Sequence, residues 1–342
     1  MIIKKVNEHA LKEWINCLID NKSVIGIQAK DDRFAFAPLK NAEDLRLDYD
    51  VSLLPPKEFL LPQKETLASF KKGEGYESVI DNKPFVLLGV HPYDMEAISQ
   101  MDEIFSQENY DEHYMARRKK AVIIVVDVQS VSENVFAGYM GTSHVESGYD
   151  ILLTKLDNEY LVDAGTKQGK ALMSKLENAP DADENDIEQR KNIWTENKQK
   201  LRQHELKADS AEWSKLLESG YEHPVWEEKA KLCFSCGSCN LVCPTCYCFD
   251  VHDDVEWNLE IGKRYRVWDS CMLEDFAKVA GGHNFRGEKA ARYRHRYYRK
   301  GKYVPSKIGG RIACVGCGRC ITACVAKIAN PVEIFNRLKE TK

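Results

Sequence analysis

Uninterrupted apolar runs mark the first half of the chain. Residues 85–90 are Phe-Val-Leu-Leu-Gly-Val and residues 121–126 are Ala-Val-Ile-Ile-Val-Val. Short runs of this kind, with β-branched side chains, are typical of central β-strands that are covered on both faces. Weaker strand patterns occupy residues 24–28, 33–38, 149–154 and 160–163. The first half therefore predicts a sheet with a buried centre.

Helical periodicity alternates with these runs. Apolar residues recur at helical intervals over residues 7–20, 93–105 and 168–177, which predicts three helices. A sheet with helices packed on it is an α/β (α+β) fold. We assign this fold to a first domain over residues 1–177.

The pattern changes after this domain. Residues 178–222 are rich in Glu, Lys, Gln and Asp, with an intermittent apolar stripe that includes Trp194, Leu201 and Trp213. The stripe predicts surface helices, so this stretch is interpreted as a polar helical connector and not as a flexible linker. Residues 223–342 are expected to form a last domain.

Cysteine placement suggests the chemistry of this last domain. Eleven of the twelve cysteines lie between Cys233 and Cys324, and eight of them form two copies of the spacing C-x2-C-x2-C-x3-C. The first copy is Cys233, Cys236, Cys239 and Cys243, and the second is Cys314, Cys317, Cys320 and Cys324. Ferredoxins bind cubane clusters with this spacing, because three close thiolates fit three corners of one cube. The chain is therefore predicted to bind two 4Fe–4S clusters in a mainly helical, ferredoxin-like domain over residues 223–342.

Structural zinc and a disulfide framework both fit the cysteine pattern less well. Structural zinc sites generally use two separated cysteine pairs to complete a tetrahedron, whereas each copy offers three evenly spaced thiols and a fourth. A secreted disulfide framework is normally a short chain with cysteine throughout, whereas only Cys17 precedes residue 233. The pattern favours metal ligands in a reducing cytoplasm.

The predicted ligand sets cross between the two copies, because the fourth cysteine of each copy binds the cluster of the other. One cluster takes Cys233, Cys236, Cys239 and Cys324, and the other takes Cys314, Cys317, Cys320 and Cys243. Crossing holds both clusters close together although 65 residues separate Cys248 from Cys314. That insertion leaves room for added helices. Gly237, Gly316 and Gly318 are expected to let the backbone approach the clusters closely.

Three further cysteines in the second half lie outside the two copies. Cys246, Cys248 and Cys271 could form an additional metal site, with His283 or Cys17 as the fourth ligand. Alternatively, they are buried thiols that pack beside the clusters, since a free cysteine behaves as a small hydrophobe. The sequence leaves both hypotheses open.

Charge and composition argue against several classes of protein. The 49 Lys and Arg residues nearly balance the 53 Asp and Glu residues, so the global charge does not indicate nucleic-acid binding. No run of about 18 apolar residues occurs, and the first ten residues do not resemble a secretory signal. We therefore expect a cytoplasmic protein without a membrane span. Neither G-x-G-x-x-G after a strand nor a P-loop occurs, so FAD and NAD(P) are expected only on a partner subunit.

A basic segment lies between the two cysteine copies. Residues 286–302 carry eight Lys or Arg residues, interleaved with Tyr293, Tyr297 and Tyr298. The segment is interpreted either as a solvated helix face or as a docking surface for an acidic partner that also raises the potentials of nearby clusters. The acidic balance of the whole chain argues against nucleic acid as the partner.

Several stretches together resemble one family. In the second half they are Cys-Pro-Thr-Cys-Tyr-Cys-Phe-Asp-Val at 243–251, Trp-Asp-Ser-Cys-Met-Leu at 268–273, Gly-Gly-His-Asn-Phe-Arg at 281–286 and Cys-Val-Gly-Cys-Gly-Arg-Cys at 314–320. In the first half they are Pro-Pro-Lys-Glu-Phe-Leu-Leu-Pro-Gln at 55–63 and Gly-Val-His-Pro-Tyr-Asp at 89–94. They are similar to the 4Fe–4S dicluster subunits of the sulfhydrogenase beta and anaerobic sulfite reductase A type, and to related subunits of flavin oxidoreductase complexes. The resemblance covers nearly the whole chain.

The resemblance implies an iron–sulfur electron-transfer subunit of an anaerobic, cytoplasmic oxidoreductase complex. Such a subunit passes single electrons between a flavin- and nicotinamide-binding reductase subunit and a catalytic reductase or hydrogenase subunit. The complex could be of the sulfhydrogenase, anaerobic sulfite reductase or heterodisulfide-reductase-linked type. Two further hypotheses stay open, namely a subunit with an additional substrate-binding metal centre and a zinc-stabilised binding module.

The chain departs from this family at four positions. Relatives carry cysteines in an Arg-Pro-Cys-Asp-like and a Cys-Phe-Cys-x-x-Met-Gly-like stretch, where this chain has Tyr93, Val135 and Ala137. A further family cysteine aligns with Val128. If those cysteines hold a third cluster in relatives, this chain lacks it as a set. We therefore expect apolar side chains to fill that place and the first domain to be a scaffold or docking domain.

Overall fold

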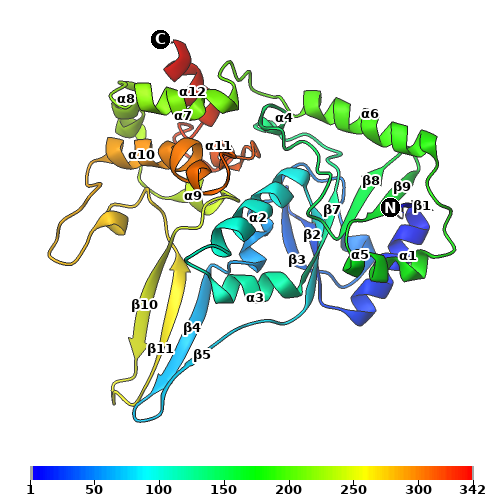
Figure 1. Cartoon of the computed structure of the whole chain (residues 1–342), viewed down its shortest axis with the longest axis horizontal. Helices are drawn as coiled ribbons and strands as arrows, with labels where there is room; N and C mark the ends of the chain where they lie inside the picture. The colour runs from blue at the N-terminus through cyan, green and yellow to red at the C-terminus, as the bar shows by residue number, and fades with distance from the viewer. Residues whose placement is uncertain (1–2, 341–342) are drawn as a thin grey trace.

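The computed structural model describes residues 3–340, and its largest element is a seven-stranded sheet (Figure 1). The strand order is β1-β9-β8-β7-β6-β2-β3. These strands are β1 (Ile3–Asn7), β2 (Val24–Lys30), β3 (Arg33–Pro38), β6 (Phe85–Val90), β7 (Ala121–Val126), β8 (Ile151–Lys155) and β9 (Glu159–Ala164). The strands β2, β6, β7 and β8 are parallel, and antiparallel strands complete both edges. The predicted α/β fold is confirmed.

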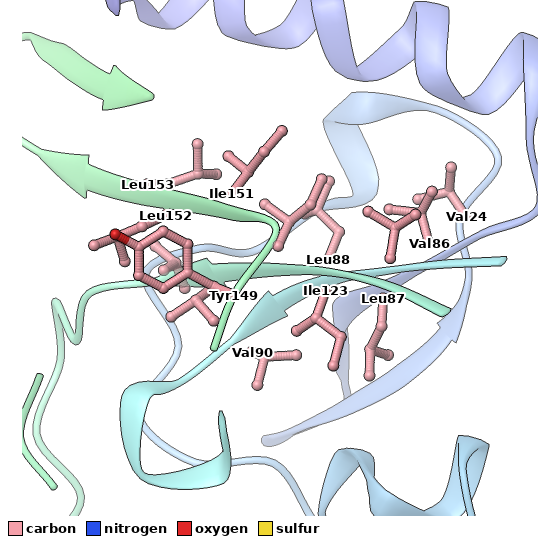
Figure 2. Packing of buried hydrophobic residues seen from close by; sticks show 14 of the residues in the cluster. Val24, Val86, Leu87, Leu88, Val90, Ile123, Tyr149, Ile151, Leu152 and Leu153 are labelled. Atoms are coloured by element: carbon pink, nitrogen blue, oxygen red, sulfur yellow. The ribbon is translucent and has the colours of Figure 1, made fainter. Parts of the chain in front are cut away.

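The two apolar runs form the centre of this sheet. All six residues of β6 and all six of β7 are buried. Figure 2 shows Val86 and Leu88 on one side of the strand and Leu87 on the other. Side chains on both faces are buried because parallel strands are covered on both sides. The pairing of Phe85 with Ala121 sets the register of the two strands.

Helices cover the sheet between the strands. The first is α1 (Glu8–Asn21), which begins where the Asn7 side chain accepts a hydrogen bond from the Ala10 backbone N–H. Between β6 and β7 lie α2 (Pro92–Phe105) and α3 (Glu112–Lys120), followed after β7 by the short α4 (Ala137–Met140). The helix expected over 168–177 is shorter, because α5 (Lys167–Leu172) continues as a 3-10 turn over Met173–Leu176.

Two helices occupy the stretch interpreted as a polar connector. They are α6 (Glu184–Lys200) and α7 (Trp213–Ser219). A capping box between Asp183 and Asp186 starts α6. Leu201 and Trp213 from the apolar stripe are buried, so the stripe packs onto the rest of the protein as expected.

The last part of the chain builds a second core. Its helices are α8 (Val225–Leu232), α9 (Ser238–Leu241), α10 (Lys289–Tyr298), α11 (Arg319–Ala323) and α12 (Pro331–Glu340), with a π-helical turn over Arg299–Tyr303. Trp213 of α7 stacks on Phe335 of α12 with ring centroids 3.7 Å apart. Figure 1 shows these helices gathered beside the end of the sheet at which α2 begins.

A four-stranded antiparallel sheet joins the two halves of the chain. Its order is β10 (Phe249–Val255), β11 (Ile261–Trp268), β4 (Lys64–Lys71) and β5 (Gly75–Ser78). Figure 1 shows this sheet projecting from the molecule, and Trp257 at its β10–β11 turn is fully exposed. The insertion after Cys248 therefore begins with a hairpin, and the added helix α10 follows later in it. The mainly helical character expected of the last domain is not confirmed.

In the described part of the chain, no helix is both long enough and apolar enough to cross a membrane.

Candidate metal centre

The two cysteine copies fold alike. Gly237 precedes α9 and Gly318 precedes α11, and both have φ +77° and ψ −12°. The residue two positions earlier also has a positive φ in each copy, 53° at Ser235 and 68° at Gly316. Each copy is therefore a left-handed turn followed by a short helix, and the same spacing produces the same local structure.

Four cysteines line one cavity near the surface, which we call the outer cavity. They are Cys233, Cys236 and Cys239 from the first copy and Cys324 from the second. Cys236 is exposed, and so are the neighbouring Phe234 and Val325. A hydrogen bond with Ser238 lowers the pKa of the Cys236 thiol. Water therefore reaches this side of the cavity.

The other four cysteines line a deeper cavity, which we call the inner cavity. They are Cys314, Cys317 and Cys320 from the second copy and Cys243 from the first. The two cavities are similar in size. Burial raises the pKa of Cys317 to about 12, and the nearby Arg319 opposes that rise.

The second copy packs directly on the first domain through two glycines. A Cβ atom at Gly316 would lie 2.6 Å from the Ala137 backbone nitrogen, and one at Gly318 would lie 2.3 Å from the Asn134 carbonyl oxygen. The Phe136 N–H also donates a 2.7 Å hydrogen bond to the Gly316 carbonyl. These glycines are needed for their positive φ and for contact with the first domain, which the spacing alone did not indicate.

A buried ion pair fixes the same contact. Arg319 follows Gly318 and makes two hydrogen bonds of 2.7 Å to the carboxylate of Asp94 in α2. Its Nε atom donates to the Ser52 carbonyl at 2.9 Å. Burial raises the pKa of Asp94, and the Arg319 guanidinium opposes that rise. The Arg319–Asp94 pair therefore holds the second cysteine copy, which lines the inner cavity, against the start of α2, directly after β6.

Three other buried cations lie beside the cysteines, and they have no carboxylate partner like Asp94. Lys57 Nζ donates to the carbonyls of Cys243 and Cys246, both at 2.7 Å. Lys300 Nζ donates to Thr245 Oγ1 at 2.5 Å, and Arg296 Nε donates to Asn240 Oδ1 at 3.1 Å. Within residues 3–340, none of these three cations forms a salt bridge with a carboxylate.

This charge pattern fits an anionic group held by thiolates. Arg296 Nη1 is buried and has no hydrogen-bond partner in the described part of the chain. Burying an unpaired cation is strongly unfavourable unless a negative charge compensates it. A cubane iron–sulfur cluster with four cysteine thiolates is such an anion. The donor set and the surrounding charges therefore suit iron–sulfur clusters.

The basic segment is not solvated throughout. Residues 286–302 form α10 and the π-helical turn, and Arg292, Arg296 and Lys300 are buried there. The interpretation as a solvated helix face is wrong at these positions. The alternative, a docking surface that also raises the potentials of nearby clusters, stays a prediction. The spacing of four residues places the three side chains on one helix face. Lys57, which lies in the stretch 55–63, was missed because nothing local marks it.

The three additional cysteines lie near the inner cavity. Asn240 Nδ2 is 3.1 Å from Cys271 Sγ, and its Oδ1 is 3.7 Å from Cys246 Sγ. A hydrogen bond with the Cys271 thiol lowers the pKa of Cys248 to about 6.

The predicted fourth ligands of these cysteines lie elsewhere. His283 is exposed, with its ring centroid 4.7 Å from that of Phe285, and Cys17 lies on α1 with Lys175 Nζ 2.5 Å from its sulfur. Over residues 3–340, no group of three Cys, His, Asp or Glu side chains is arranged to hold a single metal ion. The additional metal site stays a prediction.

The four positions at which the chain departs from its relatives lie together. Tyr93, Val128, Val135 and Ala137 belong to one buried apolar cluster, which also contains Val315 and Cys317 of the second copy. Apolar side chains fill this place, as expected.

Comparison with known proteins agrees with these features. Residues 232–328 match the sequence-family model described as a 4Fe-4S dicluster domain. Over 336 residues the chain is 31% identical to Sulfhydrogenase 2 subunit beta of Pyrococcus furiosus, and the alignment covers 98% of each chain. The chain therefore belongs to the family of 4Fe–4S dicluster proteins that contains this sulfhydrogenase beta subunit.

Proposed function

We propose that this protein is the electron-transferring iron–sulfur subunit of a multi-subunit oxidoreductase. The observation that carries the proposal is the pair of similar cavities, each lined by four cysteines, with Arg296 beside cysteines of both. The relative from Pyrococcus furiosus is named as a subunit of a sulfhydrogenase, which supports membership of a complex.

The ligand sets follow from the two cavities. We assign Cys233, Cys236, Cys239 and Cys324 to an outer cluster, and Cys243, Cys314, Cys317 and Cys320 to an inner cluster. Each set takes three cysteines from one copy and the fourth from the other, which is the crossed ligation of two-cluster ferredoxins.

The chain holds, separates and shields the two clusters. When bound, a 4Fe–4S cluster accepts and releases single electrons. The helices α9 and α11 pack against each other and so hold both cysteine copies at short range. Trp213, Phe136 and Phe335 line the inner cavity and exclude water from it. Cys236 opens the outer cavity to the surface, where the redox centre of a partner can approach.

The partners follow from what this chain lacks. Its proposed clusters handle one electron each, so a two-electron donor such as a nicotinamide requires a flavin-binding reductase subunit. A catalytic reductase or hydrogenase subunit would use the electrons. Isolation of the complex from its source, followed by identification of the companion chains, tests both assignments.

Metal analysis of the purified chain tests the cluster assignment. Two cubanes predict about eight irons per chain and a brown colour that dithionite bleaches. Zinc in place of iron would show a zinc-stabilised binding module instead. Far more than eight irons would favour a further metal centre, with Cys246, Cys248 and Cys271 as its first candidates. An isolated chain that reduced sulfite, sulfur or protons unaided would contradict a purely electron-transferring role.

A further inference from the structure

Lys57, Arg296 and Lys300 are buried cations without a carboxylate partner among the described residues, and Arg292 is a fourth. Several other buried arginines have such a partner, as in the pairs Arg117–Glu65, Arg190–Asp163 and Arg319–Asp94. Lys57, Arg296 and Lys300 donate to carbonyl, amide and hydroxyl oxygens. Lys300 also bonds to Cys243, and Arg296 to Cys320. Their charge is therefore available to whatever occupies the cysteine cavities.

Two of these cations lie beside Cys243, a cysteine of the inner cavity. Lys300 lines this cavity, and its Nζ bonds to Thr245, whose hydroxyl is 3.4 Å from the Cys243 sulfur. Lys57 bonds to the carbonyl of the same cysteine from the opposite half of the chain, and its Nζ lies 4.3 Å from the centre of the Trp268 ring. Burial lowers the pKa of Lys57 to about 8, while Cys246 and Cys243 oppose that fall.

Arg296 is shared between both cavities. It lines the inner cavity, where its guanidinium opposes the burial-driven rise in the pKa of Cys320. Toward the outer cavity, the Arg296 Nε atom donates at 3.1 Å to the side-chain oxygen of Asn240, the residue that directly follows Cys239. The guanidinium therefore stabilises negative charge in both ligand sets.

The outer cavity has a different environment. Arg292 is the other buried cation near it, but this side chain donates to the backbone carbonyls of Arg286 and Gly287, and it is 3.4 Å from Ser235 Oγ. Water reaches the exposed Cys236 and screens charge there. Buried charges interact much more strongly because the surrounding dielectric constant is low.

We propose that Lys57 and Lys300 raise the reduction potential of the inner cluster alone, and that Arg296 raises the potentials of both clusters. This inference rests on the proposed iron–sulfur function. Reduction adds one negative charge to a cluster, and a nearby buried cation stabilises the reduced form more than the oxidised form. Net charge and hydrogen bonding near the cluster are known determinants of its potential.

A redox titration followed by EPR tests the proposal on the intact holoprotein. Lys300→Met is expected to lower the equilibrium constant for reduction of the inner cluster about tenfold. This corresponds to a reduction potential lower by about 59 mV for one electron, and the potential of the outer cluster should not change. Arg296→Met is expected to lower both potentials. The outer cluster is identified by faster relaxation with a soluble paramagnetic ion, because Cys236 is exposed.

Matched controls keep the test decisive. Lys302→Met removes a lysine of the same π-helical turn whose charge is paired with Glu218 at 2.8 Å, so both potentials should stay unchanged. Lys300→Arg keeps the charge and should keep the potential. If Lys300→Met loses its inner cluster, Lys57→Met should give the same selective shift.

The outcomes separate this inference from the proposed function. A wild-type protein without two 4Fe–4S signals would contradict the function itself. Two signals whose potentials stay unchanged in Lys300→Met and Lys57→Met, or shift equally, would overturn the assignment of these lysines. A shift of only one potential in Arg296→Met would overturn the shared role of Arg296.

Discussion

At the scale of single residues, burial determines what a charged side chain does in this protein. Arg319 and Arg296 both lie beside cysteines of the second copy. Asp94 neutralises Arg319, whereas Arg296 keeps an unpartnered nitrogen atom in the described structure. The first is therefore interpreted as a structural ion pair, and the second as a group that acts on the clusters.

The Arg319–Asp94 pair leads to a prediction about stability. Arg319→Met leaves the Asp94 carboxylate buried without its counter-charge, which should cost about 3–5 kcal/mol of unfolding free energy. Adding Asp94→Leu should restore much of the loss, because an apolar pair can replace a buried ion pair. Urea unfolding under anaerobic conditions measures both changes. Equal stability of Arg319→Met and the wild type would contradict a structural role for the pair.

His91 leads to a prediction about pH. The ring is stacked on Tyr49 at a centroid distance of 3.9 Å, and its Nε2 atom is buried without a partner in the described structure. Burial, with a smaller contribution from Arg319, lowers the pKa of His91 well below its ordinary value. In the unfolded chain His91 becomes protonated as the pH falls through about 6.5, whereas in the folded protein it stays neutral. The free energy of unfolding must therefore fall as the pH drops below this value.

Protonation of His91 in the unfolded chain is expected to lower the free energy of unfolding by at most about 1.4 kcal/mol per pH unit. Urea midpoints of the wild type at pH 7.0 and pH 5.5 should therefore differ more than those of His91→Phe. His295, whose pKa is lowered to about 4 by burial, contributes in the same direction and is present in both proteins. An identical pH dependence in the two proteins would contradict the prediction.

At the scale of elements, two short helices lie at the centre of the candidate site. The turns before α9 and α11 have the same backbone geometry, and α9 carries Cys239 of the outer cavity while α11 carries Cys320 of the inner cavity. Their similarity follows from the repeated spacing, which the sequence shows directly. Their contact with each other, by contrast, depends on the folding of the whole second half.

Crossed ligation makes a prediction at this scale. Cys243→Ser should damage the inner cluster, whose other three ligands come from the second copy, and should leave the outer cluster intact. EPR spectra and iron analysis of the reduced protein measure which signal is lost. Cys17→Ser, on α1, is the control and should keep both clusters. Selective loss of the outer cluster in Cys243→Ser would show that the ligand sets do not cross.

At the scale of the whole molecule, the inner cavity lies where the two halves of the chain meet. Lys57 reaches Cys243 from the first half, and Arg319 reaches Asp94 from the second. The four-stranded sheet adds a further connection through the pairing of β4 with β11. The first half of the chain also has a large apolar core around β6 and β7.

Removal of the clusters should therefore affect the two halves unequally. Oxidation with ferricyanide followed by chelation would leave Lys57, Arg296 and Lys300 buried without a compensating charge, which destabilises their surroundings. Hydrogen exchange should rise over residues 225–340, while β6 and β7 should remain protected. Uniform loss of protection throughout the chain would show that the first domain depends on the clusters.

The sequence by itself determined the central strands and the type of metal chemistry. Buried strands and cysteine copies are encoded in neighbouring residues, so local periodicity and spacing identify them. The edge strand β10, whose residues are mostly exposed, carries no such pattern and was missed.

Only the tertiary structure decided which charges surround the cysteines. Lys57 lies 186 positions from Cys243 in the sequence, and its role appears only when the two halves pack together. The same is true of Arg319 and Asp94, which are 225 positions apart. The free energy of a buried charge depends on neighbours brought from distant parts of the chain, and these neighbours follow from the complete fold.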